Sequence, residues 1–479
     1  MLEEAVPAGL AIEGLAIEGL GDARRDVRGS LLLTRMTEAQ SARVHALAHS
    51  RPEEVGFSRW LGNPHFGAAE LRASLRSRTI ERCRGAAHVL VLQDTSEINC
   101  QAHAGRVRGL GPVGNGRDRG LFVHALLAVA ADGTGGFGAL DVLPYVRTPR
   151  TDDYRRRPIE AKESYRWIEG LAIARELTAV AALVTSVGDR EKDIYELFAR
   201  RPADEPCHLL VRACRNRKLA DGQRLFDAMA ALPVGFGYRI TVPPCRPGQP
   251  ARDARLLVRW GALRLRPPQR SRRAASDELT LWAVEVSEIE PGPGHTPGAA
   301  VPARQRLHWR LLTSHAIEEA AMAAQVIDWY RQRWHVEQLF RLLKTQGLDI
   351  EAGQTETAAG LGKLAVMSTH AAARVQQLVL ARDGDTPVPA GTLFDPLERE
   401  VLAAVQPQYE GRTEKQKNPH PPDTLAWAAW IIARLGGWKG YRHSEGPPGP
   451  LIMRRGYQRF LALVEGYRLA THLKNVCKP

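Results

Sequence analysis

Residues 326–346 read VIDWYRQRWHVEQLFRLLKTQ, and their polar and apolar side chains recur with the period of an α-helix. At about 100° per residue, one stripe of that helix is polar. It holds Tyr330, Arg333, Glu337, Arg341 and Lys344. The opposite stripe is apolar and holds Val336, Leu339, Phe340 and Leu343. The pattern predicts one helix with a buried side and a carboxylate flanked by cations.

Two interpretations of Glu337 are open from this helix alone. Arg333 and Arg341 each lie four residues from Glu337, so both could form ordinary surface ion pairs worth a few tenths of a kcal/mol. A catalytic role needs two further acidic residues, because one carboxylate cannot hold a pair of divalent cations. The rest of the chain decides between the two interpretations.

The bulk composition favours a multidomain protein that binds nucleic acid. A chain of 479 residues should divide into two to four domains. Its 66 Lys and Arg residues against 53 Asp and Glu residues give a net charge of +13. Arginine dominates the basic residues and suits bidentate binding of phosphate, so nucleic acid is the first partner to test, although a GC-rich genome would also explain part of the arginine bias.

The cysteines and the amino terminus exclude several other classes. Six cysteines are scattered with no Cys-x-x-Cys pair, so neither a zinc site nor a disulfide framework is expected. The start, Met-Leu-Glu-Glu, is acidic where a secretory signal would be basic, and no run of about 18 apolar residues occurs. We therefore expect a soluble cytoplasmic protein that does not enter a membrane.

The first 80 residues are predicted to form a small helical domain that binds DNA. A short duplication, GLAIE at 9–13 and again at 14–18, reads as a frayed or replication-slipped leader. Asp22 is a plausible N-cap, and it places Arg24, Arg25 and Arg28 on the first turns of a helix. Further on, a cluster of cations, amides and aromatics suits bases and phosphates, although solvated helix ends would explain it equally well. This cluster consists of Arg59, Trp60, Asn63, His65 and Phe66.

A mixed α/β sheet is predicted between residues 87 and 212. Two of its strands end on acidic residues: the strand 87–93 ends on Asp94, and the strand 182–187 leads to Asp189. Two further strands, 121–130 and 137–144, are joined by a hairpin turn at Asp132-Gly133. Helices at about 160–180 and 193–201 and a strand at 208–212 complete the pattern. The alternation of strands and helices indicates a mixed sheet.

A β-rich insertion with a basic segment follows at about 220–315. Its expected strands are 238–242, 255–265, 279–286 and 308–313. Between residues 251 and 275, eight arginines stand against a single acid, Asp253. They are Arg252, Arg255, Arg259, Arg264, Arg266, Arg270, Arg272 and Arg273. So many like charges repel one another unless a partner neutralises them, which favours a phosphate-binding surface over a merely solvated one.

The last part of the chain is predicted to be helical. Helices are expected at 357–381, 396–405, 425–435 and 457–473, with polar or Gly- and Pro-rich connections at 410–422 and 436–450. Apolar faces that include Trp427, Trp430, Ile431 and Ile432 would complete a core or pair with another subunit.

Asp94, Asp189 and Glu337 together supply the acidic residues that the catalytic interpretation needs. Two Mg²⁺ ions about 3.5 to 4 Å apart require such an anionic pocket to hydrolyse a phosphodiester. Carboxylate oxygens without cysteine suit Mg²⁺, and Mn²⁺ as a substitute.

The same residues carry a resemblance to a known family. The segments VLVLQDTSE at 89–97 and VGDREKDIY at 187–195, with the spacing Tyr330-x₂-Arg333-x₃-Glu337-x₆-Lys344, resemble the three active-site blocks of the bacterial DDE transposases of the insertion-sequence-four family. The similarity extends from residue 21 to about residue 437.

The resemblance implies an α/β fold with a ribonuclease-H-like mixed sheet core and flanking helical domains. The core would span 81–370, with the β-rich insertion at about 220–315. Residues 1–80 would bind the transposon ends, and 371–479 would form a helical dimerisation domain, giving a homodimer in the synaptic complex. The implied partners are the inverted-repeat transposon ends and target DNA.

The resemblance also implies roles for single residues. Asp94, Asp189 and Glu337 would bind two Mg²⁺ ions, and Tyr330, Arg333 and Lys344 would hold the phosphates beside the scissile bond. Trp309 would stack on a flipped base. Arg212 and Arg341 would also contact DNA, with Arg24, Arg25 and Arg28 in the end-binding domain. Two alternatives remain: a magnesium-dependent nuclease on the same fold without strand transfer, and a catalytically silent DNA-binding descendant.

Overall fold

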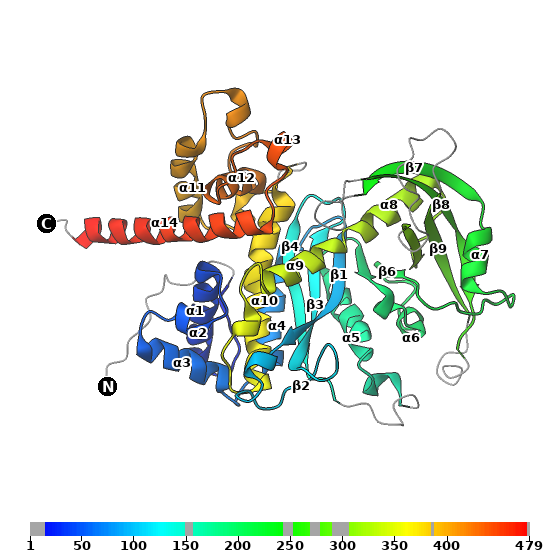
Figure 1. The fold of residues 1–479 in the computed structure, drawn as a ribbon, viewed down its shortest axis with the longest axis horizontal. Helices are drawn as coiled ribbons and strands as arrows, with labels where there is room; N and C mark the ends of the chain where they lie inside the picture. The colour runs from blue at the N-terminus through cyan, green and yellow to red at the C-terminus, as the bar shows by residue number, and fades with distance from the viewer. Residues whose placement is uncertain are drawn as a thin grey trace. The chain divides into compact units, whose positions relative to one another are not determined.

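The computed structural model describes residues 15–148, 157–242, 252–268, 278–289, 306–384 and 388–476 (Figure 1). The chain divides into two compact units. Unit 1 contains residues 1–155, 179–182 and 334–479, and unit 2 contains residues 156–178 and 183–333. Unit 1 is therefore built from the two ends of the chain, and unit 2 from its middle.

Antiparallel strands form the sheet part of unit 1. They are β1 (Val89–Asn99), β2 (Gly111–Pro112), β3 (Arg119–Ala130) and β4 (Gly136–Tyr145). Strand β3 pairs with the other three. The turn between β3 and β4 is the predicted hairpin, in which Gly133 has φ +79° and Ala130 N donates to Gly135 O at 3.0 Å. A positive φ is a conformation that glycine adopts without strain.

Asp94 lies in the middle of β1, opposite Ala125 of β3, and the prediction that it ends the strand was wrong. The strand continues through Thr95 and Glu97 to Asn99, because these polar residues stay paired with β3. A pairing partner on the neighbouring strand outweighs the polarity that suggested a strand end.

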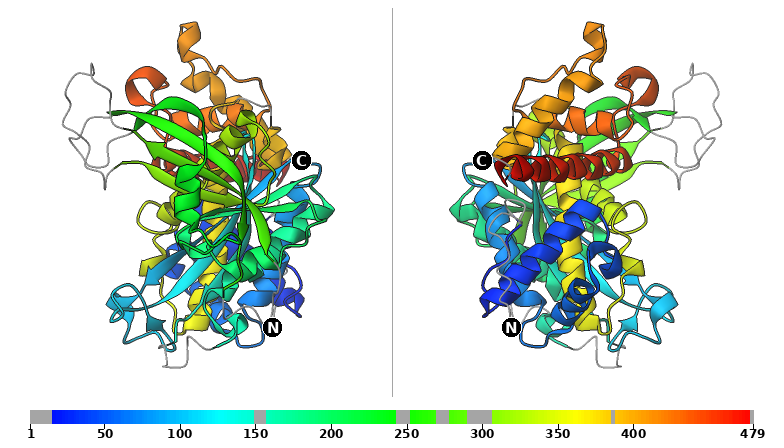
Figure 2. Two further views of the ribbon diagram at one scale, coloured as in Figure 1. Left: turned by 90° about the vertical axis from the view of Figure 1, so that its right-hand side faces the viewer. Right: turned by 90° about the vertical axis from the view of Figure 1, so that its left-hand side faces the viewer.

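The helices of unit 1 surround a long central one. They are α1 (Ala23–Ala39), α2 (Val44–Leu47), α3 (Arg51–Gly62), α4 (Ala68–Arg82), α9 (Trp334–Leu343), α10 (Ala358–Ala381), α11 (Pro396–Tyr409), α12 (Leu425–Leu435), α13 (Arg442–Glu445) and α14 (Pro450–Val476). Almost every residue of α10 is buried, and it packs against α1, α4, α9, α12, α14 and β4. Figure 2 shows α10 in yellow beside the blue amino-terminal helices and the red α14. The predicted N-cap of α1 is confirmed, since the Asp22 side chain accepts from Arg24 N at 2.9 Å.

The described part of the duplicated segment is packed into unit 1. The first copy lies outside the described residues. In the second, Leu15 and Ile17 are only 4% and 2% exposed, and Ile17 N donates to Ser30 Oγ at 2.8 Å. The prediction of a frayed leader was wrong for these residues, because they cover the apolar face of the helices that follow.

Unit 2 contains a mixed sheet. Its strands are β5 (Val184–Gly188), β6 (Cys207–Arg212), β7 (Val234–Val242), β8 (Arg252–Leu265), β9 (Leu279–Glu288) and β10 (His308–Thr313). Strands β5 and β6 are parallel, and the order β6-β10-β9-β8-β7 continues with antiparallel pairs. The four strands expected in the β-rich insertion are thus present: β10 has the predicted bounds, and β7, β8 and β9 are each longer at one end. The helices of this unit are α5 (Tyr165–Arg175), α6 (Tyr195–Ala199), α7 (Leu225–Ala231) and α8 (Ala320–Arg331).

The basic segment of the insertion is only partly described. Arg270, Arg272 and Arg273 lie outside the described residues. Arg255 and Arg264 on β8 are exposed, and Arg264 Nη1 lies 3.7 Å from Glu278 Oε2 in a solvent-exposed ion pair. Arg252 hydrogen-bonds the Glu288 carboxylate, and this ion pair is less exposed than that of Arg264.

The stretch 326–346 forms two helices, α8 and α9, and the prediction of one continuous helix was wrong. Gln332 N bonds Asp328 O and Trp329 O, and Arg333 N bonds Tyr330 O at 3.1 Å. These tightened bonds end α8 within one turn. The boundary between the two units falls in the same place, after Arg333.

Other differences concern element ends. The expected helix at 160–180 is α5 followed by a 3₁₀ turn, Glu176–Ala179. Helix α14 starts at Pro450 inside a predicted loop, and proline is well tolerated in the first turn of a helix. Helices α7 and α13 were not predicted. Within the described residues, no helix combines the length and the apolar character needed to cross a membrane.

A buried ion cluster at β4 gives the first prediction. Asp141 is 1% exposed, and its carboxylate accepts from Arg72 Nε at 2.7 Å and lies 2.5 Å from Arg76 Nη2. Replacing Asp141 by Asn leaves two partly buried cations without their counter-charge, so we expect a loss of about 3–5 kcal/mol in the free energy of unfolding.

Urea unfolding of Asp141→Asn measures this loss, with Asp204→Asn, an exposed residue, as the control. Equal stability of the two variants would show that the cluster does not stabilise unit 1.

Candidate active site

Asp94 and Glu337 come from elements of unit 1 that pack together. Helix α9 contacts both β1 and β3. Asp94 Oδ1 accepts from Thr95 N at 2.8 Å, which orients the carboxylate on the strand. Glu337 lies in the first turn of α9, where a negative charge is favoured by the helix dipole. Both side chains are partly exposed.

The apolar stripe predicted for α9 is confirmed. Val336, Leu339 and Leu343 are fully buried, and Phe340 is 7% exposed. They anchor α9 against α10 and the sheet. Because residues on the other side of a helix face away from its buried stripe, this packing directs Glu337 away from the core.

Two cations of the predicted polar stripe contact neighbouring side chains. Lys344, just beyond α9, has its Nζ 3.6 Å from Glu351 Oε1. The same Glu351 oxygen accepts from Asn99 N at 3.0 Å, so Lys344 is linked to the end of β1. Arg341 is exposed, and its guanidinium lies 4.8 Å from the centre of the Trp334 ring in a cation–π contact.

Asp189 follows β5 directly, as predicted, and lies in unit 2. It caps a 3₁₀ turn, and its Oδ1 accepts from Glu191 N at 2.9 Å. All residues of β5 are buried, so the strand fixes the position of this carboxylate.

Tyr330 is the centre of a cluster in unit 2. Its side chain is 5% exposed, and its ring lies edge-on to Trp309 with 5.9 Å between ring centres. Burial raises the pKa of the Tyr330 hydroxyl, although a hydrogen bond with Arg212 and the charges of Arg212 and Arg333 act in the opposite direction. The Asp189 charge also acts on this hydroxyl. The structure therefore brings Tyr330, Trp309, Arg212, Arg333 and Asp189 near one another.

The predicted DNA-binding residues of the first domain are divided between surface and core. Arg24 and Arg28 are exposed on the first turns of α1, and Arg25 donates to Leu20 O at 3.2 Å. Trp60 and Phe66 are 3% and 4% exposed and pack together with 4.8 Å between their rings. The proposed contact of these two aromatic rings with bases was wrong, because both belong to the core of unit 1.

Two buried charged residues beside Asp189 were not predicted. Lys192 is fully buried, and its Nζ donates to Ser186 Oγ at 2.5 Å. Asp193 is fully buried too, and its Oδ2 accepts from Cys214 N and Arg215 N at 2.9 Å each. Asp193 thereby holds the loop that follows β6. Their polar sequence context, Gly-Asp-Arg-Glu-Lys-Asp, gave no sign that either side chain is buried.

The donor set suits a hard divalent cation, since Asp94, Asp189 and Glu337 all offer carboxylate oxygens. Asp94 and Glu337 belong to unit 1 and Asp189 to unit 2. Among the residues that the structure describes, no group of three or more His, Cys, Asp and Glu side chains forms a site that could hold a metal ion.

Carboxylates that can bind divalent cations, and a cluster of Tyr, Trp and Arg side chains, are residue types that phosphoryl-transfer enzymes acting on nucleic acid use. The comparison with known families agrees: residues 187–373 match the model of the Transposase DDE domain. The matched segment contains Asp189, Trp309, Tyr330 and Glu337, whereas Asp94 precedes it. The match supports a DDE transposase, and the mixed α/β fold is consistent with a ribonuclease-H-like transposase core. Enzymes of this class generally use divalent metal ions.

Lys192 gives a prediction about pH. Burial lowers its pKa from 10.5 to about 7. Between these two values the unfolded chain binds the proton and the folded chain does not, so stability should rise with pH across this window. The contribution reaches at most ~1.4 kcal/mol per pH unit.

Urea unfolding between pH 7 and 10 measures the slope. Lys192→Met should lack this contribution, while Lys218→Met, an exposed residue of the same unit, should keep it. Identical slopes in both variants would contradict the assignment.

Proposed function

We propose that the chain is a cut-and-paste DNA transposase of the insertion-sequence-four family, similar to the transposase of transposon five. The match of residues 187–373 to a transposase DDE domain carries this proposal. The three acidic blocks support it, because each contains the acid at the position that the family uses.

In this proposal, Asp94, Asp189 and Glu337 hold two Mg²⁺ ions, which Mn²⁺ can replace. When bound, such ions activate the attacking oxygen and stabilise the leaving oxygen of a phosphodiester. The protein contributes fixed carboxylates. A backbone N–H orients Asp94, another orients Asp189, and the buried stripe of α9 positions Glu337.

The Tyr330 cluster is proposed to hold the DNA strand beside the scissile bond. A raised pKa keeps the Tyr330 hydroxyl protonated at neutral pH, so that it can donate to a phosphate oxygen. Arg212 and Arg333 supply charge next to it, and Lys344 and Arg341 add cations after Glu337. The Trp309 ring, already against Tyr330, would stack on a flipped base.

The proposed reaction proceeds in four steps, each of which forms one P–O bond and breaks one. Water first cuts one strand and frees a 3′-hydroxyl at the transposon end. That hydroxyl attacks the opposite strand and closes a hairpin, which releases the flanking DNA. Hydrolysis opens the hairpin, and the 3′-hydroxyl then attacks target DNA.

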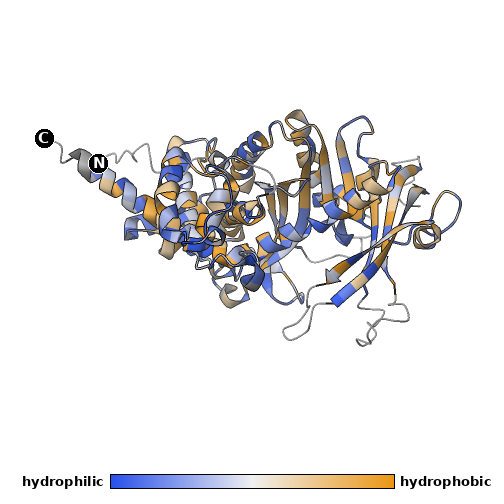
Figure 3. Ribbon diagram, turned by 90° about the horizontal axis from the view of Figure 1, so that it is seen from above, coloured by the Kyte–Doolittle hydropathy of each residue, from blue (hydrophilic) through white to orange (hydrophobic). Residues whose placement is uncertain are grey.

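Other surfaces are proposed to bind DNA ends and a second subunit. Arg24, Arg25 and Arg28 on α1 and the exposed arginines of β8 would contact phosphates. Helix α14 would contribute to a homodimer through apolar residues of its second half. Leu463, Tyr467 and Leu469 are 45%, 39% and 60% exposed. Figure 3 shows hydrophobic and hydrophilic residues alternating along this helix, which ends at the carboxyl terminus.

A magnesium-dependent nuclease without strand transfer is the main alternative, since the same fold supports both activities. A silent DNA-binding descendant is less well supported, because all three acids are present.

The decisive assay combines a precleaved transposon end with supercoiled target DNA. We expect the wild-type protein to join the two molecules. Glu337→Ala should lose cleavage and joining by at least about 10³-fold but retain binding of the ends, because a metal ligand is not needed for phosphate contacts.

Glu318→Ala, an exposed glutamate of unit 2, is the matched control and should behave as wild type. Nicking without joined products would favour the nuclease. Full cleavage by Glu337→Ala would show that Glu337 is not a required metal ligand.

Salt dependence tests the basic insertion. If Arg255 and Arg264 each neutralise one phosphate, the double change to Gln should lower the slope of log K against log salt by about 1.8. Fluorescence anisotropy with an end-containing duplex measures this slope. Arg84→Gln, an exposed arginine paired with Glu81 at 2.7 Å, should leave it unchanged. An unaltered slope in the double variant would show that β8 is not part of the DNA-binding surface of the protein.

A further inference from the structure

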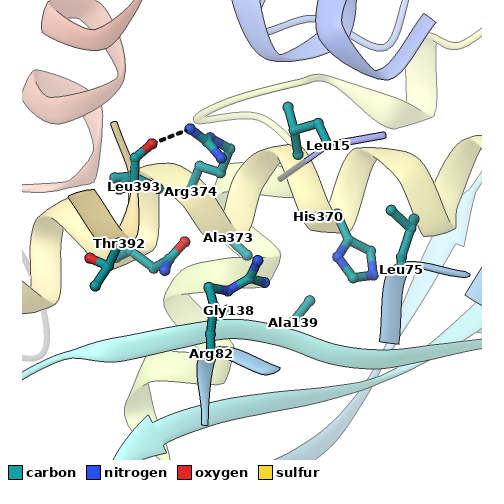
Figure 4. Close-up of a pocket in the computed structure, with 11 residues that line it drawn as sticks. Leu15, Leu75, Arg82, Gly138, Ala139, His370, Ala373, Arg374, Thr392 and Leu393 are labelled. Carbon is teal, nitrogen blue, oxygen red and sulfur yellow. Dashed lines mark hydrogen bonds between the residues drawn. The ribbon is translucent and has the colours of Figure 1, made fainter. Parts of the chain in front are cut away.

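A small cavity of unit 1 lies among α4, β4 and α10, and its volume is about 20 Å³ (Figure 4). One part of its wall is apolar and includes Leu15, Leu75 and Leu393. The polar part is formed by Arg82, His370, Arg374 and Gln377. Two arginines and a histidine thus line a space that no described carboxylate side chain borders.

Arg82 contributes a positive charge to the cavity wall, and no carboxylate among the described residues pairs with it. Its Nε donates to Phe137 O and its Nη2 to Thr79 Oγ, both at 2.7 Å, and both acceptors are neutral. No described carboxylate lies within ion-pair distance of Arg82. Burial and the charge of Arg374 lower its pKa only to about 10, so the guanidinium remains charged at neutral pH.

Arg374 adds a second positive charge to the same wall. It is 6% exposed, and its Nε donates to the Tyr457 hydroxyl at 2.9 Å and its Nη2 to Leu393 O at 2.6 Å. These partners are neutral as well. The buried Glu398 interacts with Arg374 electrostatically; burial raises the pKa of the Glu398 carboxyl, and the charge of Arg374 acts in the opposite direction.

Asp141, the carboxylate on β4, does not form an ion pair with Arg82. Asp141 already accepts from Arg72 and lies against Arg76, so one negative charge is shared by two arginines. Buried like charges in a medium of low polarity are costly unless a counter-charge joins them. Among the described residues, the arginines around the cavity (Arg72, Arg76, Arg82 and Arg374) therefore outnumber the carboxylates that interact with them or with His370 (Asp141 and Glu398).

The donors in the wall fit a small anion. In the described structure, Nη1 of Arg82 and Nη1 of Arg374 make no hydrogen bond, and neither does the His370 ring. His370 is 7% exposed, and burial together with Arg82 lowers its pKa to about 3. It is therefore neutral at pH 7 and offers one N–H donor.

We propose that this cavity binds one monovalent anion of halide size, which in a cell is chloride. A bound water would fill the space but leave Arg82 without a counter-charge among the described residues. An anion fills it and supplies the missing charge, linking α4, β4 and α10 through a single ion.

The test compares thermal unfolding of the full chain, without DNA, in chloride and in gluconate at equal ionic strength. Gluconate is too large for the cavity. We expect the wild-type Tm to be higher in chloride, by a shift on the order of 1–3 °C. Arg82→Met should lose the difference, and Arg84→Met, an exposed arginine two residues away, should keep it.

Crystals grown in bromide give an independent readout on the unmodified protein. An anomalous peak between Arg82 and His370 would support the proposal even if Arg82→Met does not fold. A cavity that holds water only, a Tm equal in both salts, or a chloride effect retained by Arg82→Met would each overturn it.

Discussion

The burial of α10 on all sides is the constraint on which unit 1 depends. A helix without a solvent face must find partners inside the protein for every polar side chain it carries. Lys363 donates to Leu61 O and Asn63 O and lies 3.9 Å from the centre of the Phe66 ring. Gln377 donates to Gly136 O at 3.0 Å. These bonds tie α3 and β4 to α10, and the apolar side of α9 packs on the same helix.

The position of Glu337 is a product of that packing. Helix α9 has only ten residues, too short to be stable on its own, so its orientation is set by its buried stripe. The helix in turn lies on β1, the strand that carries Asp94. Two of the three proposed metal ligands thus depend on the core of unit 1 rather than on contacts with each other.

The sequence predicted elements where local pattern and tertiary packing agree. Helix α12 has the predicted bounds of Leu425–Leu435, because Thr424 caps it and its residues are buried nearly all round. The sequence pattern gave wrong element bounds where contacts with other parts of the chain determine them. Ladder bonds with β3 extend β1 beyond Asp94, and a tightened turn at Gln332 splits the helix at 326–346. The burial of Lys192, Trp60 and Phe66 had no local signal either. The net charge also overstated the DNA-binding surface, since the side chains of Arg72, Arg76 and Arg374 bind partners inside the protein.

The route of the chain through unit 1 has a consequence for how the protein is made. Leu15 and Leu75 meet residues 370 and 393 at one cavity, so the first part of the chain completes its core only after more than two thirds of the sequence has been synthesised. Such distant contacts carry a large loop-closure entropy and make folding slow. During synthesis the amino-terminal helices leave the ribosome long before α10 exists to cover them. The nascent protein therefore passes through a stage in which α1 to α4 expose apolar surface, and this stage is where a chaperone would be needed most.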